Sequence, residues 1–315
     1  MHPQDLQDST VVQAALPVEK RRSISRAEFQ EAMHPIGRPI VLSGVMDIWP
    51  AMQRWTFSHF RTRYGRDYVE ALDSLYDTRH VIPTNLGEYL EYLESPEGTR
   101  LQHLEQERGL SAPFYAYGYK PFRRHPELLK DFTWPEAIED WSGYFSARFK
   151  YAHFPNWQGW LFFAPRGAVT KLHTDPGATI LAHAQIRGRK RCLLFSPDDA
   201  RFLYDGAVDP QAPDLGRFPL FAHAQPFECV LEPGTMLLLP PNWWHHITAL
   251  EGAITLSYNL VNAVNFGYYV QDRHQQHLQR WLSRLPIEPR ARILRKALGA
   301  LKRRVLGRPW SQWFR

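Results

Sequence analysis

Cysteine is scarce in this chain, and no apolar run is long enough to cross a membrane. Its two cysteines, Cys192 and Cys229, stand in a chain of 315 residues. That number excludes the dense disulfide framework of small secreted domains. Both cysteines fall in predicted strands, where a free thiol behaves as a small apolar residue. Because the sequence also lacks a signal-like N-terminus and an apolar stretch of about 20 residues, we expect a cytoplasmic protein.

Acidic residues are almost missing from the C-terminal segment, residues 270–315. This segment holds twelve Lys or Arg side chains and two acids, Asp272 and Glu288, so it accounts for the whole formal charge of +6. An apolar stripe at i, i+4, i+7 and i+11 runs through the same segment and predicts a basic amphipathic helix. The stripe consists of Leu294, Leu298, Leu301 and Val305.

Three interpretations of this basic helix are open. It could pack against the rest of the chain, or against a second copy in a homodimer, with its arginines in solvent. It could lie on a membrane surface or bind an acidic protein. It could bind nucleic acid, because Trp310, Trp313 and Phe314 are able to stack on bases. No nucleic-acid motif accompanies these aromatics, so the packing interpretation is favoured.

Short apolar and β-branched runs, separated by Pro and Gly turns, fill residues 160–261. Strands at such close intervals are typical of an all-β sandwich or barrel. The predicted strands are Trp160–Ala164, Thr179–Ile186, Lys190–Phe195, Phe227–Leu231, Thr235–Leu239 and Ala253–Val261. We therefore predict a mainly β fold with helical additions.

The N-terminal half has a different pattern. Residues 55–150 appear mainly helical and irregular in sequence, with helices predicted at 57–64, 86–93 and 125–132. Upstream, Ser25 is expected to cap a helix that continues to Met33, and residues 39–43 predict a strand. Residues 1–24 are polar and predict a loose lead-in.

The strongest chemical signal is His173-Thr174-Asp175, followed much later by His245 and His246. Residues i and i+2 of a strand point to the same side, so His173 and Asp175 can face one cavity. A histidine from a strand across that cavity would complete the two-histidine, one-carboxylate set that binds Fe(II) and leaves positions open. The alternative is that these histidines are ordinary core or surface residues.

Five segments resemble one known family in the same order along the chain. They are RPIVLSGVMDIWPAMQRW (38–55), VTKLHTDPG (169–177), AQIRGRKRCLLFSPD (184–198), LEPGTMLLLPPNWWHHI (231–247) and ITLSYN (254–259). Residues 35–265 are thus similar to the cupin-like JmjC family of Fe(II)- and 2-oxoglutarate-dependent oxygenases, especially its protein-hydroxylase branch. That branch includes the asparaginyl hydroxylase of hypoxia-inducible factor. The resemblance implies a double-stranded β-helix, or cupin jelly-roll barrel, flanked by helices.

The same resemblance implies roles for individual residues. His173, Asp175 and His245 correspond to the iron ligands and form the catalytic centre. His245 is preferred over His246 because adjacent strand residues face opposite sides and the family's ligand is the first histidine after the tryptophan pair. Lys190 corresponds to the lysine that pairs with the distal carboxylate of the cosubstrate, 2-oxoglutarate.

Further cosubstrate contacts are implied with alternatives. Thr170 and Tyr115 correspond to hydroxyl partners of the same carboxylate. Tyr117 and Tyr119 stand in the same segment as Tyr115, and a plain packing role for this segment is equally open. Asn259 corresponds to a residue near the other end of the cosubstrate.

The sequence departs from the family pattern between His173 and Lys190, where it is two residues longer than in the best-known hydroxylases. An asparagine that often stands on that strand is replaced by an apolar residue near Leu181. Lys171 is an alternative to Lys190, and His183 is expected to pack or to face the substrate rather than bind metal. No nearby glutamate supplies a fourth ligand.

The resemblance implies a dioxygenase that uses Fe(II), 2-oxoglutarate and O2, hydroxylates a side chain of a protein or peptide, and releases succinate and CO2. Oxidation of an N-methyl carbon would instead make it a demethylase. Two alternatives are open: the same chemistry on a small metabolite or natural product, and a non-catalytic barrel that binds partners through its basic tail. The expected organisation is a lead-in (1–24), the oxygenase domain (25–268) and a basic helical segment (269–315).

Overall fold

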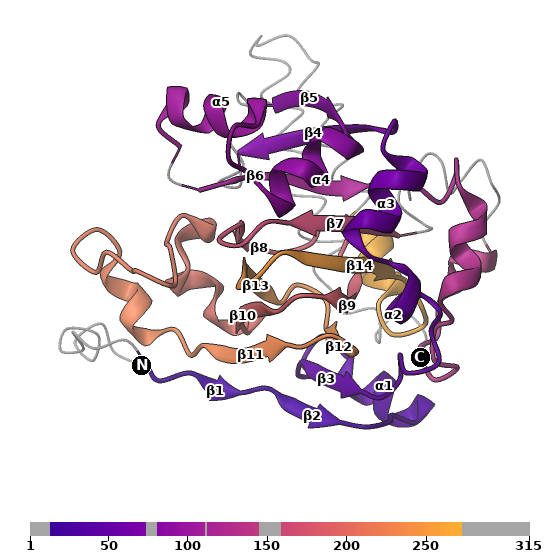
Figure 1. Ribbon diagram of the computed structural model, residues 1–315. Coiled ribbons are helices and arrows are strands. Elements are labelled where there is room, and N and C mark those ends of the chain that lie inside the picture. The colour runs from indigo at the N-terminus through magenta and orange to yellow at the C-terminus, as the bar shows by residue number, and fades with distance from the viewer. Residues whose placement is uncertain (1–12, 74–80, 111, 145–158, 273–315) are drawn as a thin grey trace, which may run out of the picture.

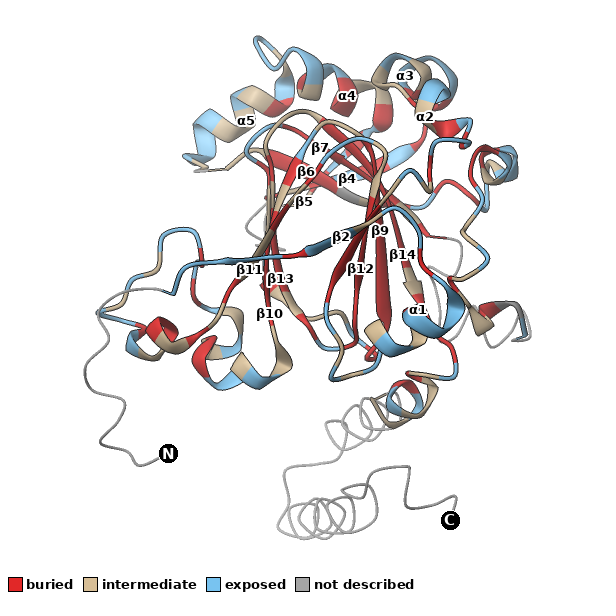
Figure 2. Cartoon of the chain, turned by 90° about the horizontal axis from the view of Figure 1, so that it is seen from below, coloured by how far each residue is buried: buried red, intermediate tan, exposed pale blue. Residues whose placement is uncertain are grey.

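The computed structural model describes residues 13–73, 81–110, 112–144 and 159–272 (Figure 1). In this part of the chain, two β-sheets face each other and bury the side chains between them (Figure 2). The smaller sheet has five strands in the order β1 (Leu16–Pro17), β11 (Phe227–Leu231), β10 (Lys190–Phe195), β13 (Trp244–Ala249) and β8 (Val169–His173). The predicted mainly β fold is confirmed.

The larger sheet supplies the opposite wall of the barrel and extends beyond it. Over the described ranges it has nine strands, in the order β2 (Glu19–Arg21), β3 (Ile40–Ser43), β12 (Thr235–Leu239), β9 (Ile180–Arg187), β14 (Ala253–Leu260), β7 (Trp160–Ala164), β6 (Phe114–Tyr119), β4 (Tyr68–Asp73) and β5 (Val81–Asn85). Apart from β2 on β3, neighbouring strands of this sheet pair antiparallel.

Strand β9 is buried on both faces. Its side chains point alternately into the hydrophobic core and into the interior of the barrel. Ile180 and Ala182 belong to the largest hydrophobic cluster, which also contains Trp55 from the helical layer. Leu181 points the other way and packs with residues of both sheets inside the barrel. Because side chains of a strand alternate, His183 shares the inward face with Leu181.

Five labelled α-helices lie among the described residues: α1 (Arg26–Ala32), α2 (Ala51–Arg54), α3 (Phe57–Tyr64), α4 (Leu86–Glu94) and α5 (Arg100–Arg108). Helices α2 to α5 gather over one face of the larger sheet (Figures 1 and 2). Helices α1, α3 and α4 lie where the sequence predicted them. Ser25 caps α1 as expected, in a capping box with Glu28.

Short 3-10 helices connect the strands: η2 (Pro126–Asp131), η3 (Trp141–Tyr144), η4 (Pro197–Phe202), η5 (Tyr204–Gly206) and η6 (Pro219–His223). The α-helix predicted at 125–132 is therefore a 3-10 helix. Its last residue, Asp131, is buried and accepts hydrogen bonds from Trp55 and Arg54. These contacts with distant residues hold the segment as a 3-10 helix, which its pattern of apolar residues did not indicate.

The prediction of a mainly helical region at 55–150 is wrong for three segments. Strands β4, β5 and β6 lie there and pair with one another or with β7. In β4, residues 68–73 alternate between exposed or half-buried and buried positions, which is the pattern of a strand with one covered face. This short period was hidden between longer helical patterns.

The predicted loose lead-in is wrong for residues 16–21. Strand β1 pairs parallel with β11, and β2 pairs parallel with β3, so this segment bridges edge strands of both sheets. Backbone hydrogen bonds such as Val18 N–H to Glu228 O, at 3.1 Å, hold it there. Side-chain polarity gives no sign of such pairing, because the bonds are made by the main chain.

Two further predictions concern the cysteines and the C-terminus. Cys192 and Cys229 are free, buried and directly opposite each other in β10 and β11, as expected for small core residues. The basic helix predicted at 270–315 lies outside the described residues from 273 onward, and so does any homodimer contact made through it. Within the described residues, no helix is both long and apolar enough to traverse a bilayer.

Candidate metal centre and its cavity

A cavity of about 410 Å³ lies between the two sheets. Its polar lining consists of Tyr115, Thr170, Lys171, His173, Asp175, His183, His245, Ser257 and Asn259. Aromatic side chains of β7, Trp160 and Phe162, form another part of the wall. Six of the seven residues that the sequence singled out therefore line one cavity, and the seventh, Lys190, contacts its wall.

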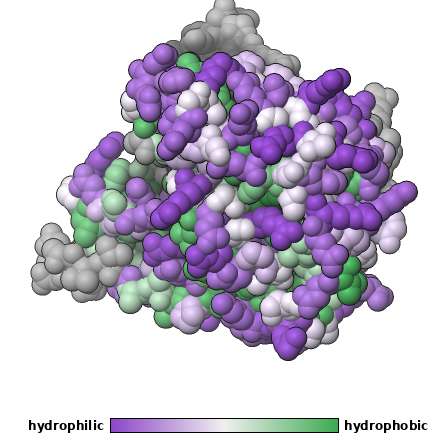
Figure 3. All heavy atoms as spheres, in the orientation of Figure 1, coloured by the Kyte–Doolittle hydropathy of each residue, from purple (hydrophilic) through white to green (hydrophobic). Residues whose placement is uncertain are grey.

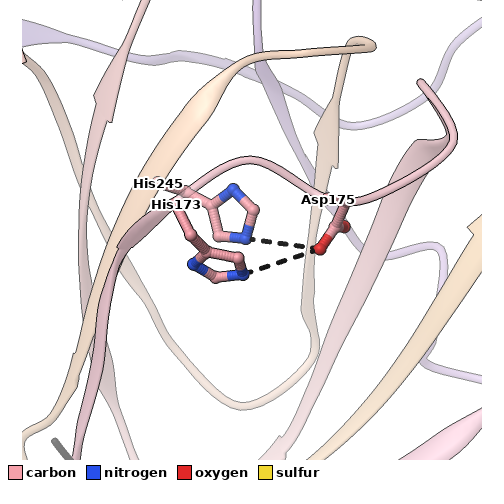
Figure 4. A group of neighbouring side chains, drawn as sticks. All are labelled: His173, Asp175 and His245. Carbon is pink, nitrogen blue, oxygen red and sulfur yellow. Dashed lines mark ion pairs between the residues drawn. The ribbon is translucent and has the colours of Figure 1, made fainter. Parts of the chain in front are cut away.

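The three predicted ligands meet at one point of this cavity. His173 ends β8, and His245 lies directly opposite it in β13, with ring centroids 4.1 Å apart. Their Nε2 atoms lie 3.6 and 3.8 Å from Oδ1 of Asp175 (Figure 4). One ligand atom from each residue lies within 4.8 Å of the other two, so the set can surround a single metal ion.

Both histidines are oriented for metal binding by their other ring nitrogen. Nδ1 of His173 lies 2.8 Å from the carbonyl oxygen of Lys171, and Nδ1 of His245 lies 3.3 Å from that of Trp243. A ring that donates from Nδ1 carries its lone pair on Nε2, the atom that faces Asp175. Metal-ligating histidines are usually fixed by such a contact. The donor set therefore fits a divalent metal of the Fe(II) type.

Asp175 does not belong to the strand that holds His173, contrary to the prediction. Strand β8 ends at His173, and a turn follows in which Gly177 and Ala178 have φ values of 84° and 47°. Such positive φ values break the extended pairing. Both side chains nevertheless line the cavity.

Electrostatics keep Asp175 ionised and His245 neutral. Burial opposes the charge on Asp175, but the nearby imidazoles of His173 and His245 outweigh it and lower the pKa. Burial and the proximity of His173 lower the pKa of His245 to about 4. Burial also opposes the charge on His173, but the nearby carboxylate of Asp175 outweighs it and raises the pKa. A metal ion at Nε2 would replace that proton.

His246 faces away from this centre. Its Nε2 lies 3.8 Å from Oδ1 of Asp209, and burial lowers its pKa to about 4. The alternation of β13 thus brings His245, and not His246, to Asp175.

Lys190 is a buried cation near the same cavity. It is 2% exposed, and its Nζ donates to the hydroxyl of Tyr115 at 3.3 Å. The ammonium also lies 5.7 Å from the ring centroids of Tyr115 and Phe162, which line the cavity. Burial lowers its pKa to about 7. Within the part of the chain that the structure describes, no carboxylate pairs with it.

The tyrosine segment of β6 divides between two places. Tyr115 is buried beside Lys190, whereas Tyr119 donates its hydroxyl to Asp67, away from the cavity. The side chain of Tyr117 lies outside what the structure describes. Of the two described tyrosines, Tyr115 is the one near the predicted cosubstrate lysine.

Asn259 and Thr170 also line the cavity. The Nδ2 atom of Asn259 donates to Oδ2 of Asp175 at 2.9 Å and to the hydroxyl of Thr179 at 2.7 Å. Thr170 stands opposite Ile247 in the β8–β13 register. The contacts of Asn259 and Thr170 with a cosubstrate stay predictions. The sequence did not indicate that Asn259 lies beside the carboxylate of Asp175.

The residues at which the sequence departs from the family pattern line the cavity. Leu181 and His183 line it from β9, and the alternative lysine, Lys171, is exposed where it borders the cavity. The sequence predicted a packing or substrate-facing role for His183 but did not indicate its partner Ser257, whose hydroxyl oxygen lies 3.2 Å from Nδ1 of His183. The signal was present, since 181 and 183 lie on one face of a predicted strand, but packing explained a lone histidine equally well.

Comparison with known proteins agrees with this geometry. Residues 26–269 match a family described as cupin-like domain. Lysine-specific demethylase JMJ21 of Arabidopsis thaliana is 30% identical over 81% of this chain and 26% of its own length. Lysine-specific demethylase 8 of Xenopus tropicalis is 29% identical over 70% of this chain and 47% of its own length. tRNA wybutosine-synthesizing protein 5 of Homo sapiens is 28% identical, with 75% of each chain covered.

The chain spans about a quarter and about half of the two demethylases, and three quarters of the third relative. The family match, residues 26–269, covers the barrel and its flanking helices. The more specific resemblance to the asparaginyl hydroxylase stays a prediction.

Proposed function

We propose that this chain, which belongs to the cupin-like domain family of JmjC-type Fe(II)- and 2-oxoglutarate-dependent oxygenases, is a dioxygenase that hydroxylates a side chain of a protein or peptide. Its cofactor would be Fe(II), its cosubstrates 2-oxoglutarate and O2, and its coproducts succinate and CO2.

One observation carries this proposal: a buried lysine with no carboxylate partner among the described residues contacts the wall of the cavity that holds the three candidate ligands. Burying a cation without an opposite charge is unfavourable, so Lys190 indicates an anionic ligand that enters the cavity. A ligand that reaches from the histidines to Lys190 needs a metal-chelating group at one end and a carboxylate at the other. 2-Oxoglutarate has both groups.

The residues of the chain divide the work accordingly. His173, Asp175 and His245 would hold Fe(II), and Asn259 would orient the Asp175 carboxylate. Bound Fe(II) would supply the oxidising chemistry with O2 and 2-oxoglutarate. The three protein ligands leave positions open for the cosubstrate, and the apolar walls around them limit access of water.

The size of the cavity favours a small reacting group. A volume of about 410 Å³ falls at the lower end of small-molecule sites, roughly 300–1,000 Å³, and the cosubstrate would take part of it. The remaining space suits one side chain inserted from outside. The molecular face drawn in Figure 3 is mostly hydrophilic, with apolar residues in small separate groups.

A second candidate substrate is an RNA nucleoside. The human relative, for which the alignment covers 75% of each of the two chains, is named for synthesis of a tRNA nucleoside. In addition, residues 270–315 of this chain carry twelve Lys or Arg side chains. Basic residues neutralise phosphates and would hold a polynucleotide near the barrel. The reaction would again be oxidation of one group inserted into the cavity.

The primary test measures succinate formed from 2-oxoglutarate by the purified full chain with Fe(II) and O2. The matched control is His173→Ala, which removes one ligand at the end of a strand. We expect turnover in the wild type and none in the variant. Equal turnover in both would contradict the metal assignment. Where succinate is not formed, calorimetric titration with 2-oxoglutarate decides, because a protein that binds no cosubstrate would instead be a non-catalytic binding module.

Mass spectrometry then separates the candidate substrates. Pools of peptides, methylated peptides, tRNA and small metabolites are incubated with wild type and His173→Ala. Gain of one oxygen atom by a peptide supports the proposed hydroxylase. Loss of a methylene unit with release of formaldehyde indicates a demethylase, and an oxidised nucleoside or metabolite indicates the corresponding alternative.

A further inference from the structure

His183 presents an unsatisfied polar atom to the cavity. The residue is 4% exposed and lines the cavity from β9. Its Nδ1 lies 3.2 Å from the hydroxyl oxygen of Ser257, but its buried Nε2 has no hydrogen-bond partner in the described part of the chain. Buried polar atoms are nearly always paired, so an unpaired one at a cavity wall indicates a ligand.

His183 and Lys190 share Phe162 as a neighbour. The ring centroid of His183 is 5.9 Å from that of Phe162, and Nζ of Lys190 lies 5.7 Å from the same Phe162 ring. Burial, followed by the charge of Lys190, lowers the pKa of His183. His183 is therefore near the lysine, and it lines the same cavity as the candidate ligands.

The metal is not the ligand that this geometry suggests for His183. Its nitrogens are not among the atoms that cluster within 4.8 Å in the triad of His173, Asp175 and His245. Leu181, on the same face of β9, offers no polar atom to the cavity. His183 lies two residues after Leu181 on that face and is the polar side chain that β9 presents to the cavity.

We propose that His183 binds the cosubstrate, with its Nε2–H donating to the carboxylate that also pairs with Lys190. This inference rests on the function proposed above. In this arrangement the hydroxyl of Ser257, 3.2 Å from Nδ1, would donate to Nδ1 and leave the proton on Nε2. Burial, followed by the charge of Lys190, keeps the pKa of His183 well below its usual range, so the ring is neutral and carries a single N–H.

The test compares two oxo acids that share the chelating end. 2-Oxoglutarate has the distal carboxylate, and 2-oxobutyrate lacks it. Each is titrated calorimetrically into the Fe(II)-loaded full chain without O2, for the wild type and His183→Leu. The variant should bind 2-oxoglutarate about ten- to a hundredfold more weakly, the range of a lost charge-assisted hydrogen bond, and should bind 2-oxobutyrate as the wild type does.

His183→Gln and Ser257→Ala complete the series. Glutamine keeps an N–H, so it should restore much of the affinity that leucine loses. Ser257→Ala removes the group that fixes the tautomer of His183. It should weaken the binding of 2-oxoglutarate by a smaller factor than His183→Leu does and leave the affinity for 2-oxobutyrate unchanged. Fe(II) affinity, measured on each variant, shows that the barrel and the triad are intact. If His183→Leu loses Fe(II), the Gln and Ala variants carry the test.

The outcomes separate the two proposals. Unchanged 2-oxoglutarate affinity in His183→Leu overturns the role of His183 and leaves the oxygenase proposal standing. Equal losses for both oxo acids also overturn it, because the contact would then not involve the distal carboxylate. If the wild type binds no 2-oxoglutarate at all, both proposals fail together.

Discussion

The side-chain amide of Asn259 donates a 2.9 Å hydrogen bond to Oδ2 of Asp175, while the two histidines approach the other oxygen, Oδ1. The carboxylate is therefore held from both sides before any metal binds. Such outer contacts fix the direction of a ligand's lone pairs. Asn259 lies 84 residues from Asp175 in the chain, so β14 and the turn after β8 position the ligand together.

The first prediction concerns this contact. Asn259→Ala should weaken Fe(II) binding by about ten- to a hundredfold, the usual effect of losing an outer contact. Titration of the metal-free protein with Fe(II) under anaerobic conditions measures it. The matched control is Ser257→Ala, two residues earlier on β14, whose hydroxyl contacts His183 and not Asp175. Wild-type metal affinity in Asn259→Ala would show that the contact is dispensable.

The adjacent histidines of β13 should differ in metal binding. His245→Ala should abolish stoichiometric Fe(II) binding, because it removes one of three ligands. His246→Ala should retain it, since that side chain lies beside Asp209. Circular dichroism confirms that each variant is folded. Loss of metal by His246→Ala alone, with His245→Ala unaffected, would reverse the assignment.

The two candidate lysines differ in burial and should differ in effect. Lys190→Met keeps the aliphatic stem and removes the charge, so the affinity for 2-oxoglutarate should fall by about ten- to a hundredfold. Lys171→Met removes an exposed charge and should change the affinity by about twofold or less, as expected for solvent-screened contacts. The opposite ranking in calorimetry would make Lys171 the cosubstrate lysine.

Cosubstrate binding should weaken as the pH rises above neutrality. Burial lowers the pKa of Lys190 to about 7, and only the protonated ammonium attracts a carboxylate. Affinity should therefore be fully developed below that pKa and decline above it, by up to about tenfold per pH unit, until the pKa of the complex is reached. Lys190→Arg keeps its charge throughout this range and should show a flatter profile. An equally steep decline in the arginine variant would exclude Lys190 as the titrating group.

Much of the fold was readable from the sequence because local patterns encode it. The six strands predicted between 160 and 261 are short runs bounded by Pro and Gly, and each appears in the structure within one residue of its predicted bounds, whereas β8 and β13 were not among them. Ser25 and Glu28 form the capping box that starts α1, which is a relation over three residues. The choice between His245 and His246 likewise depends on the two-residue period of a strand.

Tertiary structure decided what local patterns cannot contain, namely which distant groups meet. It placed Asp175 in a turn beyond β8 and gave it Asn259 as a partner. It buried Lys190 against Tyr115, 75 residues away, and left Nε2 of His183 facing the cavity. Residues 16–21 joined the sheets through backbone bonds that carry no side-chain signature. The sequence determined which groups are available, whereas the packing of the two sheets determined which of them share one site.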